Sequence, residues 1–483
     1  MDYSQFFNMI PECVLMLGLV VVFLFDVFGK NSDGKLCITQ YLTVLSLVAT
    51  AAVSCLMGTG EAFSGLYVST EAAAVMKTIL AAGTVIVIFT AKSWLATDEV
   101  RHYAGEFCML VLSTLLGMYM MMSAGHFLMF FLGLEMASVP MACLVAFDKY
   151  RHNSAEAGAK FILTATFSSG VMIYGISLLY AACGTLYFDD VAKVISASPL
   201  TIAGMVFFFS GLGFKISLVP FHFWTADSYQ GAPTTVTGYL SVVSKGAAAF
   251  TLCAILMKVF APMVEYWTVL LYIVIVLSIT IANLFAIRQS DLKRFMAFSS
   301  ISQAGYIMLA VVGNSAMSMT ALTYYVLIYV VANLSVFTII SAVEEHNNGT
   351  VMMDSYNGLY KTNPRLAFLM TLALFSLGGI PPFAGMFSKF FVFMAAVQGA
   401  DIHTTLGAWA YGVVFIALVN TVLSLYYYLL IVKAMFIKHS DNPLPTFQSA
   451  CSTKLALAIC TVGIVAFGIC SCVFDWISVA ANA

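Results

Sequence analysis

Apolar stretches of about 20 residues recur along the whole of this chain, separated by short polar connections. Each is long enough to cross a bilayer as a helix. Hydrophobic residues make up 61% of the sequence and charged residues only 9%, whereas about 25% of the residues of a soluble domain are charged. The sequence therefore predicts an all-α polytopic membrane protein embedded in the lipid bilayer. No basic run in it suggests a nucleic-acid partner.

The apolar stretches predict a single membrane domain, 1–483, with about 14 transmembrane helices. The approximate spans are 9–29, 37–57, 73–93, 107–123, 127–147, 160–182, 200–222, 235–258, 266–287, 296–313, 319–342, 366–398, 408–437 and 455–476. The first stretch has no basic leader or small-residue cleavage site and contains Glu12 and Asp26, so it is predicted to be a span and not a signal peptide. These two acids lie near the ends of the span, where an interfacial position is expected.

The distribution of basic residues between alternate loops predicts the orientation of the chain. With the N-terminus outside, nearly all loop lysines and arginines fall on the cytoplasmic side, and only Lys193 and Lys258 fall outside. The prediction is a protein of the bacterial cytoplasmic (inner) membrane, with both termini in the periplasm.

One segment, residues 211–224, places a charge and a helix break together inside an apolar run. Lys215 lies in the middle of the seventh predicted span, and an ammonium in hydrocarbon costs about 2.5–3.5 kcal/mol or more. Pro220 interrupts the helix, and His222 follows it. Irregular backbone at membrane depth is tolerated where it lines a polar cavity. This segment is therefore the first candidate for a functional site.

Other charged residues also fall inside predicted spans. Lys245, Lys389 and Glu135 lie too deep to reach the membrane surface, so a functional role is expected for them. Lys77 and Lys160 lie near helix starts, where a lysine can extend to the interface, and the two interpretations are equally good for them.

A second broken helix is predicted at Gly378–Pro382, within the twelfth span. Five helices separate the two breaks, an odd number, so the halves are predicted to be inverted relative to one another. The parts are the N-terminal three helices (1–106), a first five-helix repeat (107–258), a second inverted repeat (266–437) and a C-terminal helix (455–476). Inverted repeats with broken helices point to a transport path near the middle of the membrane.

The buried charges suggest a proton relay. If Glu135 moves away from Lys215, the lysine loses its counter-charge and releases its proton more readily, first to Lys245 and then to Lys389. His222 could link the first two lysines, or it could simply cap the helix after the break. Hydroxyl groups that could hold a water chain, or simply pack between helices, belong to Tyr306, Tyr426, Tyr427, Tyr428, Ser299, Ser300 and Ser302.

The cysteines give no sign of a redox centre. The 11 cysteines lie mostly in apolar segments, without a CxxC pair or metal-binding spacing. No iron–sulfur or haem motif is present among them, so the chain is expected to bind no cofactor.

Four stretches closely resemble the antiporter-like subunits of respiratory complex I, and the resemblance covers nearly the whole chain. The stretches are 131–135, 213–224 followed by 227–233, 291–302 and 378–389. The complex I subunits called L, M and N share this core. The chain length, Lys389 and the sequence 425–429 favour the subunit N branch, because subunit L is longer and subunit M usually has a glutamate at the position of Lys389.

The resemblance implies roles for the matched positions. Glu135 and Lys215 would form a switching ion pair, with Lys245 as the central and Lys389 as the terminal relay lysine. Lys160 matches a family lysine near the pair, and Lys293 matches one near the cytoplasmic end of the tenth helix. Gln303 replaces a histidine that many subunits N have, which favours holding water over exchanging protons at that position.

The resemblance also implies an assembly. The chain would be a non-redox, proton-translocating subunit of an NADH:quinone oxidoreductase. Its neighbours would be subunit M on one side and the small subunits A, J and K on the other, with NADH, FMN, iron–sulfur clusters and quinone bound by other subunits. A subunit of a multisubunit sodium/proton antiporter is the main alternative, because it shares the fold and the lysines, and a non-pumping structural spacer is a weaker one.

Overall fold

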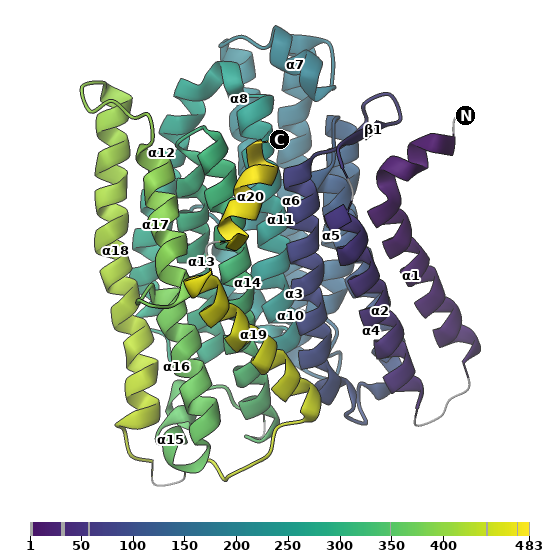
Figure 1. Cartoon of the computed structure of the whole chain (residues 1–483), viewed down its shortest axis with the longest axis vertical. Helices are drawn as coiled ribbons and strands as arrows, with labels where there is room; N and C mark the ends of the chain where they lie inside the picture. The colour runs from purple at the N-terminus through teal and green to yellow at the C-terminus, as the bar shows by residue number, and fades with distance from the viewer. Residues whose placement is uncertain are drawn as a thin grey trace.

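The computed structural model describes residues 3–29, 34–56, 58–347, 349–440, 443–470 and 472–482. It is an upright bundle of helices (Figure 1). The helices are α1 (Ile10–Phe28), α2 (Lys35–Leu56), α3 (Glu71–Leu95), α4 (Ala104–Met122), α5 (Phe127–Val145), α6 (His152–Cys183), α7 (Phe188–Val194), α8 (Pro199–Ile216), α9 (Phe223–Gly231), α10 (Thr234–Tyr239), α11 (Lys245–Lys258), α12 (Val264–Ala286), α13 (Leu292–Val311), α14 (Ala316–Glu345), α15 (Leu359–Thr362), α16 (Pro364–Gly378), α17 (Ala384–Val397), α18 (Thr405–Phe436), α19 (Cys451–Ile469) and α20 (Cys472–Asn482).

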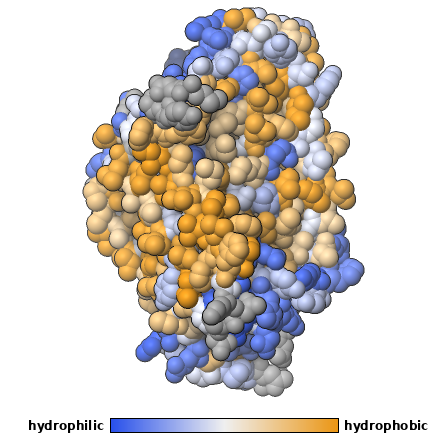
Figure 2. Space-filling model, turned by 90° about the vertical axis from the view of Figure 1, so that its right-hand side faces the viewer, coloured by the Kyte–Doolittle hydropathy of each residue, from blue (hydrophilic) through white to orange (hydrophobic). Residues whose placement is uncertain are grey.

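The all-α membrane fold expected from the sequence is confirmed. In the described part of the chain, twelve helices are long and apolar enough to cross a membrane. The two further predicted spans are α13, whose apolar character is reduced by its serines, and the broken pair α16 and α17. On the face that carries α1 and α2, apolar side chains cover the middle and polar side chains gather toward the two ends (Figure 2).

Some details differ from the sequence prediction. The seventh span does not end at residue 222, because α8 stops at Ile216 and the chain continues beyond the break as α9. A short antiparallel hairpin, β1 (Gly60–Ala62) and β2 (Tyr67–Ser69), joins α2 to α3 and was not predicted. Its strands are only three residues long, too short for an alternating pattern to show in the sequence.

The two broken helices share the same local geometry. Ser217 and Gly379 adopt left-handed conformations, with φ of 68° and 83°, and each lies three residues before a proline, Pro220 or Pro382. The left-handed residue ends the first half-helix, and the proline keeps the helix from resuming at once. Figure 1 shows α8 beginning near α7 and α16 beginning at the opposite end of the bundle, so the two broken helices run in opposite directions, as the predicted inversion requires.

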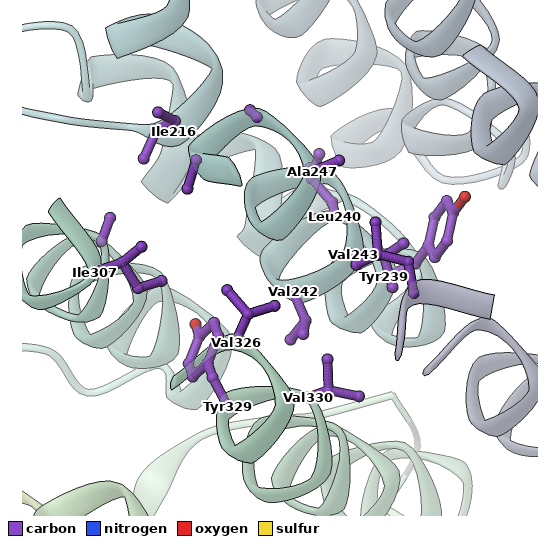
Figure 3. Packing of buried hydrophobic residues seen from close by; sticks show 14 of the residues in the cluster. Ile216, Tyr239, Leu240, Val242, Val243, Ala247, Ile307, Val326, Tyr329 and Val330 are labelled. Atoms are coloured by element: carbon purple, nitrogen blue, oxygen red, sulfur yellow. The ribbon is translucent and has the colours of Figure 1, made fainter. Parts of the chain in front are cut away.

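The centre of the bundle is formed by α14 and by the segment from α10 to α11, whose most apolar windows are 94% and 89% buried. Val242, Val326 and Val330 converge between these helices (Figure 3). Close to this core, α4 and α5 approach each other at Gly117 and Gly133, where an added Cβ would collide with the facing backbone. These contacts fix α5, which carries the acidic residue of the candidate site.

Candidate functional site

Lys215 lies in the last turn of α8, directly before the break, and its side chain is buried. Its Nζ donates a hydrogen bond of 2.8 Å to Ser138 Oγ on α5 and lies 5.8 Å from the centre of the Phe161 ring. Glu135 is one turn before Ser138 on the same helix. No ion pair between Glu135 and Lys215 occurs among the described residues, so their pairing stays a prediction for another arrangement of the two helices.

Lys245 occupies the most central position of the three deep lysines. It follows directly on a π-helical turn, Leu240–Ser244, a local irregularity that is frequent at functional sites. Its Nζ donates to Ser300 Oγ of α13 at 2.7 Å and lies 5.3 Å from the centre of the Tyr229 ring. The same Ser300 hydroxyl accepts a hydrogen bond of 3.0 Å from Tyr329.

From Ser300 a series of polar groups leads toward Lys389. Tyr325 lies one turn from Tyr329 on α14, and its hydroxyl donates to Gln303 Oε1. The amide nitrogen of Gln303 is 3.4 Å from the carbonyl oxygen of Leu377, at the end of α16. Lys389 donates to the adjacent carbonyl, Gly378, at 3.1 Å.

A cavity of about 10 Å³ lies at the end of this series, against Gln303, Tyr325, Tyr329 and Lys389. That volume is close to the minimum that one water molecule needs, and the cavity walls supply polar partners for it. The structure thus brings Lys245 and Lys389 to the two ends of one line of hydroxyl, amide and carbonyl groups.

Several of the hydroxyl residues named from the sequence belong to this line. Ser299 Oγ and the Tyr428 hydroxyl lie 2.5 Å apart, and Tyr428 also accepts from Gln303 at 3.1 Å. Tyr426, by contrast, is exposed on the outer face of α18. Tyr325 and Tyr329 were missed by the sequence analysis, although their spacing of four residues places both on one face of a helix.

His222 lies at the start of α9 and is buried, with its ring against that of Phe223. Its Nδ1 has no hydrogen-bond partner in the described part of the chain. No hydrogen bond among the described residues joins it to Lys215 or Lys245. The predicted link between the two lysines through His222 therefore stays a prediction, and it would need a water molecule or a movement of the ring.

Lys160 lies away from the buried line, on the outer side of α6. Its Nζ is 2.7 Å from Glu156 and 2.7 Å from Asp227, and its side chain is 45% exposed. Arg294 binds the other oxygen of Asp227 at 2.7 Å, which joins α6, α9 and α13. This network holds α9, the second half of the broken helix, against its neighbours.

Lys293 lies at a large polar cavity at the end of the bundle opposite α7. The cavity has a volume of about 780 Å³ and is lined by Lys293, Arg151, Asp148, Glu344 and Thr234 among others. Lys293 is buried and donates to the carbonyl of Ala232 at 2.6 Å.

The charges at this cavity are coupled to one another. Arg151 lies 3.1 Å from Asp148 and 3.5 Å from Glu344. Burial raises the pKa of the Asp148 carboxyl above its ordinary value, and the nearby Arg151 opposes that shift. Thr234, at the start of α10, donates to Glu344, and α10 leads directly to the π-helical turn before Lys245. Water therefore has access to the helix that carries the central lysine.

A buried ion pair was missed by the sequence analysis. Lys77 Nζ on α3 lies 2.6 Å from Glu12 on α1, and the two side chains are only 1% and 5% exposed. The Tyr67 hydroxyl is 3.0 Å from each of them. Glu12 is buried inside the protein near the start of α1, beside Tyr67 of the hairpin β1–β2, and its position relative to the membrane surface stays a prediction. The only signal for the pair was one acid in the first predicted span and one base in the third.

Comparison with known proteins agrees with this geometry. The chain matches the transmembrane family described as NADH:quinone oxidoreductase/Mrp antiporter over residues 124–415. It is 55% identical over 483 residues to the NADH-quinone oxidoreductase subunit N of Phocaeicola vulgatus, covering 99% of both chains. It is 48% identical over 484 residues to the protein of the same name from Azobacteroides pseudotrichonymphae, covering 99% of this chain and 98% of that one.

Solved structures show the same fold. A chain of respiratory complex I from Thermus thermophilus is 29% identical, with a TM-score of 0.79 over 95% of this chain and 97% of that chain. A chain of the Mrp complex from Dietzia is 19% identical, with a TM-score of 0.83 over 100% of this chain and 97% of that one. The second likeness concerns the fold alone.

Two broken helices with deep lysines beside them thus occur in a chain whose sequence matches the family model over more than half its length. The chain belongs to the NADH:quinone oxidoreductase/Mrp antiporter family of membrane proteins. Within that family it falls in the branch of the NADH-quinone oxidoreductase subunits N, as the relatives covering its full length show. The family and the branch predicted from the sequence are both confirmed.

Proposed function

We propose that this chain carries protons across the membrane as a non-redox subunit of an NADH:quinone oxidoreductase. The observation that supports the proposal most directly is the series of polar groups that runs from Lys245 through Ser300 and Gln303 to Lys389. Each step is a hydrogen bond, one helical turn or the two adjacent carbonyl groups at the end of α16. Lys245, Gln303 and Lys389 are all buried in the bundle.

Lysine is suited to this task because its charge is expensive in a dry interior. A buried ammonium is held by the groups that face it, and a change in those groups shifts the balance toward the neutral amine. Lys215 is held by a neutral serine hydroxyl, with Glu135 one turn away on α5. A small movement of α5 against α8 would change the distance between the carboxylate and the ammonium and so control proton release.

The position of the cavity supports one direction of proton movement. Protons would enter through the polar cavity at Lys293 and Arg151, at the end of the bundle where the basic loops lie. They would pass to Lys245 along α10 and leave from Lys389 toward the opposite end. This assignment places the basic end in the cytoplasm and both termini in the periplasm, in agreement with the charge distribution between the loops.

The assembly implied by this function is the membrane arm of the oxidoreductase. The relatives are subunits N of that enzyme, and the structural neighbours come from multisubunit membrane complexes. We place subunit M on one side of the chain and the small subunits A, J and K on the other. Electrons would pass through NADH, FMN, iron–sulfur clusters and quinone bound by other subunits, so this chain would bind no cofactor.

The test uses the substitution Lys215→Ala in the assembled complex, compared with Lys193→Ala as the control. Lys193 is also a lysine, but it lies on α7 and its side chain is 73% exposed. Native membrane vesicles would be assayed for quinone-dependent proton uptake, and native gels would report assembly. We expect Lys215→Ala to reduce proton transport about a hundredfold or more, in the range typical of losing a proton-transfer group, with assembly intact. Unchanged transport in an intact complex would refute the proposal.

The same vesicles and native gels distinguish the oxidoreductase subunit from a sodium/proton antiporter subunit with the same fold. The antiporter would migrate with a smaller set of membrane subunits and would exchange sodium for protons without quinone reductase activity. The matches to subunits N over 99% of the chain favour the oxidoreductase. A structural spacer is disfavoured because the deep lysines are all present and in contact with polar partners.

A further inference from the structure

A cavity separate from the proton-carrying groups lies between α16 and α19. Its volume is about 660 Å³. One wall is the first part of α16, the other is residues 454–462 of α19, and the chain segment 446–449 forms its floor. The floor lies at the end of the bundle where the basic loops occur, and the cavity extends from there into the apolar zone between the two helices.

The floor is a fixed part of the fold. The Thr446 hydroxyl donates to the carbonyl of Thr362 at 3.0 Å, and the Asn363 side chain binds the backbone of both Pro445 and Phe447 at 3.1 and 3.2 Å. The ring of Phe447 also stacks on His346. These contacts tie the segment to the end of α15 and to the residue that precedes α16.

The mouth of the cavity lies at the same end as the floor segment and is positively charged. Arg365 on α16 and Lys454 on α19 both line it, and no acidic residue does so among the described lining residues. Neither cation takes part in an ion pair of the described residues. The first turn of α16 adds backbone N–H groups at the same place, because Asn363 uses its side chain on the floor segment and makes no side-chain capping bond. An anionic group would therefore be well placed at this mouth.

Beyond the mouth the walls are apolar. They are formed by Leu366 and Leu369 on α16 and by Leu457, Ala458 and Val462 on α19. From Lys454 to Val462 the helix rises about 12 Å, so the apolar wall is long enough for a large part of an acyl chain. A free inorganic anion would leave this wall without a partner, and a neutral lipid would leave the two cations without one.

We propose that this cavity is a binding site for an anionic phospholipid from the leaflet at the basic end of the bundle. Its phosphate binds between Arg365, Lys454 and the start of α16, and one acyl chain lies against Leu369 and Val462. The lipid would thus bridge α19 to α16, the first half of the second broken helix. The site does not depend on the proton-carrying role of the chain, so the two proposals can fail separately.

The test uses a phosphatidylglycerol probe with a photoreactive group on its acyl chain. The intact complex containing this chain would be reconstituted into phosphatidylcholine vesicles with the probe, irradiated, and digested for mass spectrometry. We expect labelled peptides from the α16 and α19 walls. The double substitution Arg365→Gln/Lys454→Gln should reduce that labelling about tenfold. The control Lys361→Gln/Lys438→Gln removes two cations at the same end but outside the cavity, and should leave the labelling unchanged.

A second variant covers the case in which the double substitution prevents assembly. Val462→Trp keeps both cations but fills the apolar part of the cavity, and it should also abolish labelling of the two walls in the assembled complex. A phosphatidylcholine probe that labels the walls as strongly as phosphatidylglycerol would overturn the proposal. Labelling that persists in the charge variant, or cross-links showing that a segment of another subunit fills the cavity, would overturn it as well.

Discussion

The buried pair between Glu12 and Lys77 gives the sharpest test of how the N-terminal helices are held. Its two charged atoms are 2.6 Å apart, and the side chains are 5% and 1% exposed, so solvent screens the pair very little. The Tyr67 hydroxyl lies 3.0 Å from both, and Tyr119 donates to the carbonyl of Lys77 at 2.6 Å. The pair joins α1 to α3, and it adds to the packing of α1 against α2 and α4.

Removing one partner would leave the other charge buried and uncompensated, which typically costs about 3–5 kcal/mol. We therefore expect Lys77→Met and Glu12→Gln each to lower the free energy of unfolding by that amount. The double substitution leaves no charge behind, so its cost should be smaller than the sum of the single costs by about 2 kcal/mol. Lys258→Met is the matched control, because the ion pair of Lys258 with Asp189 is 2.8 Å long but roughly half exposed.

The assay is unfolding of the purified chain in mixed micelles with increasing SDS, followed by tryptophan fluorescence. The control should change the free energy of unfolding by about 1 kcal/mol or less, as exposed ion pairs do. If the buried pair behaves like the control, or if the single costs simply add in the double variant, then the two charges do not depend on each other and the reasoning is wrong.

Two further predictions concern the second broken helix and the polar cavity. Gly385→Ala should lower the unfolding temperature of the complex, because its new Cβ would collide with the backbone of α16. The control Gly412→Ala adds a Cβ in open space on α18 and should change the free energy of unfolding by no more than about 0.5 kcal/mol. Burial raises the pKa of Asp148 in the folded chain, so its protonated form stabilises the fold at low pH. That contribution is lost as the pH rises through the raised pKa. Asp148→Asn should therefore flatten the dependence of the unfolding temperature on pH above the ordinary aspartate value of 3.8.

Much of the fold follows from the sequence because the bilayer imposes a simple rule. Every backbone polar group in lipid must be satisfied within the chain, so apolar stretches of sufficient length become helices. The breaks at Pro220 and Pro382 were visible for the same reason, since proline cannot continue a helix. The hairpin β1–β2 was not visible, because it lies outside the apolar spans and its strands are held by the local contacts of a short loop.

The candidate site was predictable in its charges but not in its partners. The cost of burying an ammonium identifies Lys215, Lys245 and Lys389 from the sequence alone. Which neutral groups they bind depends on how the helices pack, and hydroxyl residues such as Ser138 and Ser300 are common in spans without a polar role. The Glu12–Lys77 pair was missed because the burial of a side chain within the protein cannot be read from its distance to the end of a span.

The two broken helices differ in where they carry their lysines. Lys215 lies two residues before its left-handed residue, Ser217, and the equivalent position before Gly379 is the apolar Leu377. The second lysine lies instead beyond the break, on α17, and donates back across it to the carbonyl of Gly378. Because the two helices run in opposite directions, this shift places both lysines on the half-helix nearer α7 (Figure 1). A lysine at the strictly equivalent position would lie on α16, the half-helix farther from α7. Because the second lysine lies on α17 instead, Lys215 and Lys389 both belong to the half-helices nearer α7.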